Sequence, residues 1–218
     1  MRVVILPTEQ EASDFAADFI EKLIIDKENA VLGLATGSSV LLTYEALIKK
    51  YQSGKMSFKN ITTFNLDEYV GLKPHHIQSY RHYMNRKLFN HIDIDQKKTY
   101  IPECFNKDYE LSCENYESTI KSLGGIDIQV LGIGTNGHIG FNEPTSSLSS
   151  RTRVKTLTQN TIENNSRFFK DNETQPSLAI TMGIGTIMDA KQILLLGLGK
   201  HKSKAIAEVI EGPVSSFF

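Results

Sequence analysis

The sequence lacks the charge excess and the long hydrophobic segments that mark nucleic-acid-binding and membrane proteins. Its 218 residues carry 24 Lys and Arg against 25 Asp and Glu, which leaves a formal net charge of −1. Without a basic surplus nothing draws the chain to the phosphate backbone of a nucleic acid, so we expect no nucleic-acid partner. No segment approaches the roughly 18 apolar residues of a membrane span, so we expect no membrane association either.

Signals for secretion and for metal binding are also absent from the sequence. The apolar run before Pro7 is short and acidic residues follow it at once, unlike a signal peptide, so we predict a soluble cytoplasmic protein. The two cysteines, Cys104 and Cys113, are then expected to be free thiols. No CxxC or HExxH spacing occurs, so nothing supports a zinc site and we predict no metal.

Short apolar runs alternate with longer amphipathic segments along the whole chain. The apolar runs predict strands at residues 2–7, 30–36, 61–69, 126–134, 152–158, 176–182 and 192–199. The amphipathic segments predict helices at residues 8–27, 38–54, 79–92, 107–125, 159–170 and 200–212, with a turn at 183–190. Most of these strands are apolar throughout rather than alternating, which is typical of a sheet that is covered on both faces.

Strands that alternate with helices favour a mostly parallel sheet. We therefore predict an α/β fold with a mostly parallel central sheet and helices on both faces, Rossmann-like and doubly wound. No internal repeat or linker is visible, so one domain over residues 1–218 is the simplest interpretation. The chain ends on two phenylalanines without a capping element, so either they pack back onto the domain or the chain is truncated there.

Two glycine-containing segments predict a site for an anion. In open parallel sheets ligands bind outside the carboxyl ends of the strands, and residues 34–39 and 197–204 each lead from a predicted strand into a helix. In the first, Gly37 allows close backbone approach and the helix start offers free N–H groups. In the second, lysines open the helix, which is unfavourable unless an anion offsets them. A serine-capped turn and a solvated charge run are the plain alternatives.

Two further segments carry candidate proton-transfer groups. Asp67 and Glu68 follow an apolar strand, where one carboxylate could serve as a general base and the alternative is a turn or capping acid. The stretch "GIGTNGHIGFNEP", residues 132–144, places Asn136, His138 and Glu143 in a glycine-rich turn after a buried strand. A carboxylate beside a histidine fixes its tautomer and supports its protonated form, so a functional role is favoured over a structural one.

These segments together resemble the glucosamine-6-phosphate deaminase family. The similar stretches run in order over nearly the whole chain and are "ATGSS", "NLDEYVGL", "GIGTNGHIGFNEP", "SRTRVKTLT", "NSRFF", "TMGIGTIMDA" and "LGLGKHK". The pairing of "GHIGFNEP" with "LDEY" is highly specific, whereas "TGSS" alone would be weak. In the related 6-phosphogluconolactonases a "GHTASLFP"-like segment is expected at the place of "GHIGFNEP".

The resemblance implies a reaction without a metal or an organic cofactor, on a small-molecule sugar phosphate. Glucosamine 6-phosphate is opened, isomerised from aldose to ketose, and loses ammonia to give fructose 6-phosphate. By resemblance, Asp67 moves a proton between C2 and C1, and His138, paired with Glu143, serves ring opening. The implied catalytic residues are Asp67, Asn136, His138 and Glu143. The implied phosphate-binding residues are Gly37, Ser38, Ser39, Arg167 and Lys202.

Two departures from the family qualify these expectations. Some members carry Asp where this chain has Asn136, and an amide cannot share the positive charge of His138, so the pH profile is expected to differ. Longer members have a C-terminal extension and form hexamers activated by N-acetylglucosamine 6-phosphate, with Arg153 and Lys155 at positions used there. This chain ends before such an extension, so we expect no allosteric activation and a monomer or small homo-oligomer.

Rival functions come from the same fold. A 6-phosphogluconolactonase-like hydrolase or another sugar-phosphate isomerase is the enzyme alternative, and ammonia release would exclude the lactonase. A non-catalytic sugar-phosphate sensor is the other alternative, but such a sensor usually adjoins a DNA-binding module, and no basic helix-turn-helix segment is visible.

Overall fold

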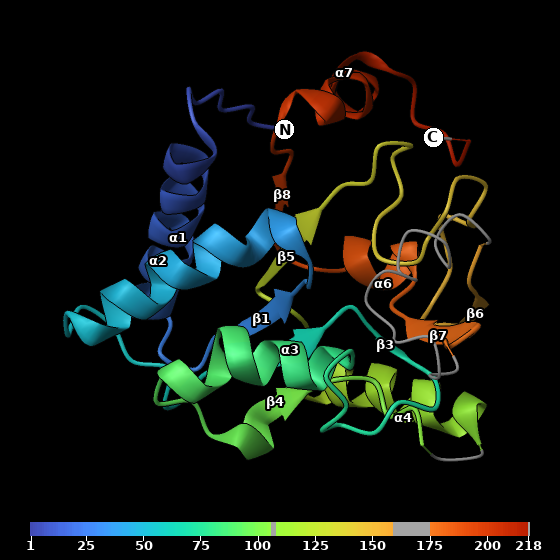
Figure 1. The fold of residues 1–218 in the computed structure, drawn as a ribbon, viewed down its shortest axis with the longest axis horizontal. Coiled ribbons are helices and arrows are strands. Elements are labelled where there is room, and N and C mark those ends of the chain that lie inside the picture. The colour runs from blue at the N-terminus through green and yellow to red at the C-terminus, as the bar shows by residue number, and fades with distance from the viewer. Residues whose placement is uncertain (106–107, 159–174, 218) are drawn as a thin grey trace.

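A parallel sheet of five strands forms the centre of the molecule. The computed structural model describes residues 1–105, 108–158 and 175–217. The strand order is β4-β2-β1-β5-β8, and every pair in it is parallel (Figure 1). The strands of this sheet are β1 (Val31–Leu34), β2 (Thr62–Asn65), β4 (Thr99–Tyr100), β5 (Ile128–Gly132) and β8 (Ile193–Leu196). The predicted α/β fold with a mostly parallel central sheet is confirmed.

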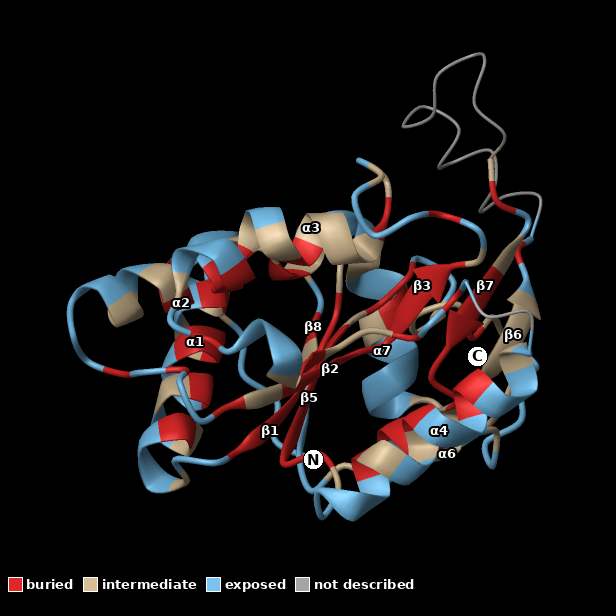
Figure 2. Ribbon diagram, turned by 90° about the horizontal axis from the view of Figure 1, so that it is seen from below, coloured by how far each residue is buried: buried red, intermediate tan, exposed pale blue. Residues whose placement is uncertain are grey.

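Helices cover both faces of this sheet. Figure 2 shows α1, α2 and α3 on one side and α4 and α6 on the other, while Figure 1 shows α7 following β8 at the sheet edge. The α-helices are α1 (Glu9–Asp26), α2 (Leu41–Gln52), α3 (Tyr80–Lys87), α4 (Tyr109–Ser122), α6 (Ile184–Met188) and α7 (Ser203–Glu211). Short 3-10 helices are η1 (Ser38–Val40), η2 (Phe89–His91), η3 (Gln96–Lys98) and η4 (Lys200–Lys202). No helix in the described ranges is long and apolar enough to cross a membrane.

The first helix illustrates why these segments fold as they do. Thr8 caps α1, because its side-chain oxygen accepts a hydrogen bond from the Glu11 N–H at 3.1 Å. Apolar residues at helical spacing then form one buried stripe, which includes Ala16, Ile20 and Ile24. That stripe packs into the main core, as β1 does along its whole length.

A second sheet departs from the prediction. Its three strands are antiparallel, in the order β3-β7-β6, and comprise β3 (Asp67–Tyr69), β7 (Leu178–Thr181) and β6 (Arg153–Thr156). Residues 61–69, predicted as one strand, divide at Leu66 between the two sheets. The Leu66 N–H donates to the carbonyl of Leu34 in the first sheet, and its own carbonyl accepts from Met182 beside the second. One residue thus turns the chain from β2 into β3.

Other local predictions were wrong or lie outside the described residues. Residues 2–7 do not form a strand: Met1 to Ile5 are exposed, and none of the described strands pairs with this segment. The predicted turn at 183–190 contains the short helix α6. The helix predicted at 159–170 falls outside the described residues. At the other end, Phe217 does not pack back and is 81% exposed.

Candidate active site

The loops that follow four strands meet at one edge of the parallel sheet. In the order β2-β1-β5-β8, the segments after these strands carry Asp67 at the start of β3, the Gly37 turn (residues 35–37), the His138 loop (residues 133–144) and Lys202. Because the strands are parallel, their carboxyl ends lie at the same edge (Figure 1). The chain runs outward from β1 to β2 and β4 and then resumes on the other side of β1 with β5. The Gly37 turn and the His138 loop therefore flank the switch point where such sheets bind ligands.

Asp67 and Glu68 are both buried but serve different neighbours. Successive side chains of a strand point to opposite faces, so the two carboxylates diverge. The Glu68 carboxylate accepts backbone hydrogen bonds of 2.9 Å from Tyr69, Tyr80 and Arg81. Two of these donors open α3, where a negative charge is favourable. Glu68 is therefore the capping acid of α3, and Asp67 is the candidate base.

Asp67 has the environment of a proton acceptor. Burial, with a smaller contribution from Glu68, raises its pKa to about 8. Within the described part of the chain no group donates a hydrogen bond to its carboxylate. The His138 loop packs directly against Asp67 at Gly140. A Cβ placed on that glycine would lie only 2.9 Å from Asp67 Oδ2 and 3.1 Å from Thr181 Oγ1.

His138 is oriented by an amide rather than directly by a carboxylate. Its Nδ1 lies 2.6 Å from Asn136 Oδ1, whereas Glu143 Oε2 is 3.8 Å away. The Asn136 amide in turn donates to Glu143 Oε2 at 2.9 Å, which fixes its oxygen toward the imidazole. Because that oxygen can only accept, Nδ1 carries the hydrogen in the neutral ring and Nε2 keeps its lone pair. The predicted pairing of His138 with Glu143 is thus mediated by Asn136.

The electrostatics of His138 favour its neutral form. Burial lowers its pKa below the ordinary value, Glu143 opposes this shift, and Lys202 adds to it. Lys202 thus acts on the imidazole electrostatically, although the two residues belong to different loops. The imidazole packs directly against Gly134. A Cβ on that residue would lie 2.3 Å from Cε1 and Nδ1 of the ring, so a larger residue would displace it. A neutral imidazole with a free Nε2 can accept a proton and return it.

The described residues predicted to bind an anion lie in the turn after β1 and in the loop after β8. Gly37 has φ 100°, and a Cβ there would meet nothing within 4 Å, so this turn faces open space. Ser38 and Ser39 begin η1, where the first N–H groups of a helix have no internal partner. Lys202 ends η4 and is partly buried, which lowers its pKa. Arg167, predicted to bind the same anion, lies outside the described residues.

The structure adds residues that sequence reasoning missed. The Tyr83 hydroxyl of α3 donates to the Gly37 carbonyl at 2.7 Å, and the Tyr44 hydroxyl of α2 donates to the Ala35 carbonyl at 2.5 Å. Thr181 lies opposite Asp67 in the β3–β7 pair, and its hydroxyl accepts from the Phe141 N–H. No local signal distinguishes the two tyrosines, because each lies in an ordinary amphipathic helix.

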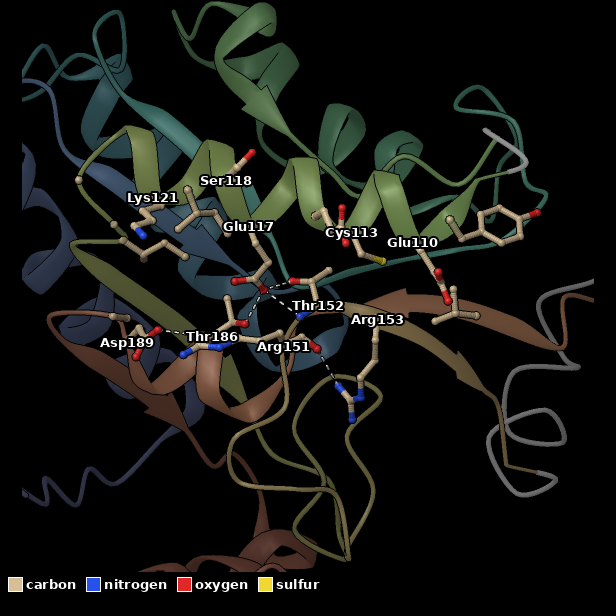
Figure 3. Close-up of a pocket in the computed structure, with 18 residues that line it drawn as sticks. Glu110, Cys113, Glu117, Ser118, Lys121, Arg151, Thr152, Arg153, Thr186 and Asp189 are labelled. Carbon is tan, nitrogen blue, oxygen red and sulfur yellow. Dashed lines mark hydrogen bonds and ion pairs between the residues drawn. The ribbon is translucent and has the colours of Figure 1, made fainter.

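A cavity among the described residues lies elsewhere. It has a volume of about 1100 Å³ and is lined by α4, α6 and the segment around β6 (Figure 3). Within it Glu117 accepts hydrogen bonds from Thr152 and Thr186, and Arg151 pairs with Asp189. These contacts tie elements together, and none of the candidate catalytic residues lines this cavity. The candidate catalytic residues thus lie at the strand ends, outside this cavity.

Metal ligands do not gather in the described ranges. They contain no group of three or more His, Cys, Asp and Glu side chains placed to hold a metal ion. Cys104 and Cys113 are both buried free thiols, as expected. Burial raises the pKa of Cys113 to about 11, so this thiol is not an activated nucleophile at neutral pH.

Comparisons with known proteins agree with this geometry. A family profile described as glucosamine-6-phosphate isomerases/6-phosphogluconolactonase matches residues 8–216. The glucosamine-6-phosphate deaminase of Colwellia psychrerythraea is 52% identical over 217 residues, covering 99% of this chain and 81% of the relative. That of Shewanella halifaxensis is 53% identical over 216 residues, covering 99% and 82%.

Solved structures separate the closer relatives from the more distant ones. One described as a monomeric glucosamine-6-phosphate deaminase is 47% identical with a TM-score of 0.95, covering 100% of this chain and 90% of its own. The 6-phosphogluconolactonase of Thermotoga maritima is 21% identical with a TM-score of 0.71, covering 93% and 87%. The second similarity shows a shared fold alone.

Proposed function

The chain belongs to the family of glucosamine-6-phosphate isomerases and 6-phosphogluconolactonases, and from this premise we propose that it is a glucosamine-6-phosphate deaminase. The reaction converts glucosamine 6-phosphate and water to fructose 6-phosphate and ammonia. One observation carries the proposal: a buried carboxylate with a raised pKa lies directly under the loop that presents an oriented, neutral imidazole. A C2 proton transfer needs such a base, and ring opening needs such an acid–base group.

Substrate binding is assigned to the two anion-binding loops. The phosphate is bound by the backbone N–H groups and hydroxyls of Ser38 and Ser39, which begin a helix behind a glycine. Lys202 from the neighbouring loop, and Arg167 by family resemblance, supply the positive charge. An arginine fork and a lysine together match the geometry and the near-double charge of a phosphate monoester.

Ring opening is assigned to His138. Nε2, left unprotonated by the Nδ1–H contact to Asn136, takes the proton of the C1 hydroxyl and delivers one to the ring oxygen. The bond between C1 and the ring oxygen then breaks, giving an aldehyde at C1 and a hydroxyl at C5. Asn136 and Glu143 keep the imidazole in the required tautomer throughout.

Isomerisation and loss of ammonia follow from the Asp67 carboxylate. Asp67 removes the proton from C2 and returns it to C1, which turns the amino aldehyde into the imine of the ketose. Water then adds to C2 and ammonia leaves, so atoms and charge balance without an oxidant or reductant. Because proton transfer at carbon is slow in water, a base held in place is worth about 10²–10⁴ in rate.

The lactonase alternative makes a distinguishable prediction. A lactonase needs a base-activated water and no proton transfer at C2, and the structures with that activity are only about 20% identical to this chain. Purified protein incubated with glucosamine 6-phosphate is expected to release ammonia and fructose 6-phosphate in equal amounts. Hydrolysis of 6-phosphogluconolactone without ammonia release from the amino sugar would overturn the assignment.

Assembly and location are part of the same proposal. We propose a monomer, supported by the relative described as monomeric that matches at 47% identity and a TM-score of 0.95. We also propose a cytoplasmic enzyme, because a doubly charged sugar phosphate does not cross a lipid bilayer unaided. Light scattering over a range of protein concentrations tests the first point.

The pH dependence of kcat/KM follows from Asp67. A base acts in its deprotonated form, so with a pKa of about 8 the reactive fraction increases as the pH rises toward 8. We expect kcat/KM to rise about tenfold per pH unit between pH 6 and 7.5 and to level off above 8, since this ratio reports the free enzyme. Initial rates in buffers of constant ionic strength, corrected for the separately measured titration of the substrate, check this. A flat profile over that range would assign the base elsewhere.

A further inference from the structure

The anion-binding turn is held from two sides by tyrosine hydroxyls. Tyr44 of α2 donates to the carbonyl of Ala35, and Tyr83 of α3 donates to the carbonyl of Gly37. The two bonds lie two residues apart, on the short stretch between β1 and η1. Two different helices thus fix the carbonyls of a turn whose N–H groups would bind the phosphate.

The direction of a backbone N–H is fixed by the direction of the carbonyl in the same planar peptide unit, which belongs to the preceding residue. No peptide bond in the described ranges is cis, and in a trans peptide unit the C=O and N–H point in opposite directions. Holding the Gly37 carbonyl against Tyr83 therefore aims the Ser38 N–H away from α3. That N–H belongs to the first residue of η1, so it has no partner inside the helix. Gly37 has φ 100°, and a glycine backbone has more accessible conformations than that of any other residue. Without the hydrogen bond from Tyr83, this turn would therefore be less restricted.

The helix that carries Tyr83 is itself anchored near the candidate base. Glu68 binds the N–H groups of Tyr80 and Arg81 at the start of α3, and the Arg81 guanidinium donates to Thr99 Oγ1 at 2.6 Å. Tyr83 follows within one turn of that anchor. Burial raises the pKa of its hydroxyl to about 12, so the group remains a protonated donor at neutral pH. Helix α3 thus connects β3, which carries Asp67, with the Gly37 turn.

We propose that Tyr83 is a positioning residue for the substrate phosphate, holding the Gly37–Ser38 peptide so that the Ser38 N–H is presented to the anion. The inference rests on the proposed function and adds a residue outside the substrate-binding loops. It predicts an effect on phosphate binding rather than on the proton transfers. A residue that only packed against the core would affect thermal stability and leave phosphate affinity unchanged.

Tyr83→Phe tests this, because it removes the hydroxyl and keeps the ring. We expect KM for glucosamine 6-phosphate to rise about threefold to tenfold, the factor that loss of one hydrogen bond gives, with kcat within about twofold. The inhibition constant of inorganic phosphate should rise by the same factor. Tyr51→Phe is the matched control: Tyr51 is a partly buried tyrosine of α2 for whose hydroxyl no partner occurs among the described residues.

The outcomes separate this inference from the proposed function. Unchanged KM and phosphate inhibition in Tyr83→Phe, or a fall in kcat at constant KM, would overturn the role of Tyr83. Absence of ammonia release by the wild-type protein would instead overturn the deaminase assignment. In that case calorimetric titration with inorganic phosphate still measures the effect of Tyr83. All variants are compared at a temperature where circular dichroism shows them fully folded.

Discussion

Asp67→Asn is expected to lower kcat by about 10²–10⁴-fold while KM changes only slightly. The amide has nearly the shape of the carboxylate but cannot take the C2 proton, so binding remains and isomerisation stops. Steady-state rates of ammonia release measure kcat, and the inhibition constant of phosphate measures binding independently. Near-normal turnover in this variant would show that another group is the base.

The same substitution should stabilise the protein at alkaline pH. The folded-state pKa of Asp67 is about 8 and the ordinary value is 3.8, so between these values the folded chain holds a proton that the unfolded chain has lost. Stability therefore falls as pH rises through this window, and remains lower above 8, where a buried charge must be kept. Asp67→Asn removes that cost, so its melting temperature at pH 9 should exceed that of the wild type, whereas at pH 4 the two should converge.

Glu68→Gln is the control for both measurements. Glu68 is the adjacent buried carboxylate, but it accepts three backbone N–H groups around the start of α3. The substitution should lower stability, because both carboxylate oxygens accept backbone N–H groups and the amide of Gln offers only one acceptor oxygen. If Glu68→Gln abolished proton transfer at C2 and Asp67→Asn did not, Glu68 would be the base and Asp67 would not.

Lys202→Ala is expected to raise KM by about 10- to 100-fold with kcat changed only a few-fold, the loss of one hydrogen bond between charged groups. Phosphate contacts hold substrate and transition state alike, so their removal weakens binding without slowing the chemistry. Lys200→Ala, an exposed lysine of the same turn, is the matched control and should behave as wild type. A large loss of kcat at constant KM would contradict a phosphate-binding role.

A second readout of Lys202 does not depend on activity. Its charge contributes to the lowered pKa of His138, so removing it should raise that pKa. NMR titration of the His138 ring in the free protein measures the change. In the control variant Lys200→Ala the pKa of His138 should stay at its wild-type value. The result would locate Lys202 beside the imidazole in solution.

The sequence predicted most of the central sheet because its strands carry their own signals. Apolar runs gave β1, β5 and β8, and the topology of parallel strands then placed the loops after them at one edge. The failures have a common cause, since a strand requires a partner that its own residues do not specify. Residues 2–7 have strand-forming side chains but pair with none of the described strands, and Leu66 divides one apolar run between two sheets.

The candidate site was predictable in its motifs but not in its contacts. The pattern of glycines, Asn136, His138 and Glu143 indicated an oriented imidazole, yet only the structure shows the amide lying between histidine and carboxylate. The strand pattern left Asp67 and Glu68 equivalent, and only the family resemblance selected Asp67. The hydrogen bonds of Glu68 to Tyr80 and Arg81 of α3 give the physical distinction between them. Tyr83 carries no signal at all, because its contact to Gly37 joins residues 46 positions apart.

The position of β8 has a consequence for biosynthesis. This strand is at the border of the sheet, contacts only β5 within it, and precedes the lysine assigned to the phosphate. A nascent chain that has not yet emerged past residue 202 therefore lacks the lysine proposed to bind the phosphate, even where its earlier strands have paired. A ligand stabilises only the conformation that binds it, so phosphate would stabilise the chain against unfolding only after the segment up to Lys202 has been synthesised and has folded.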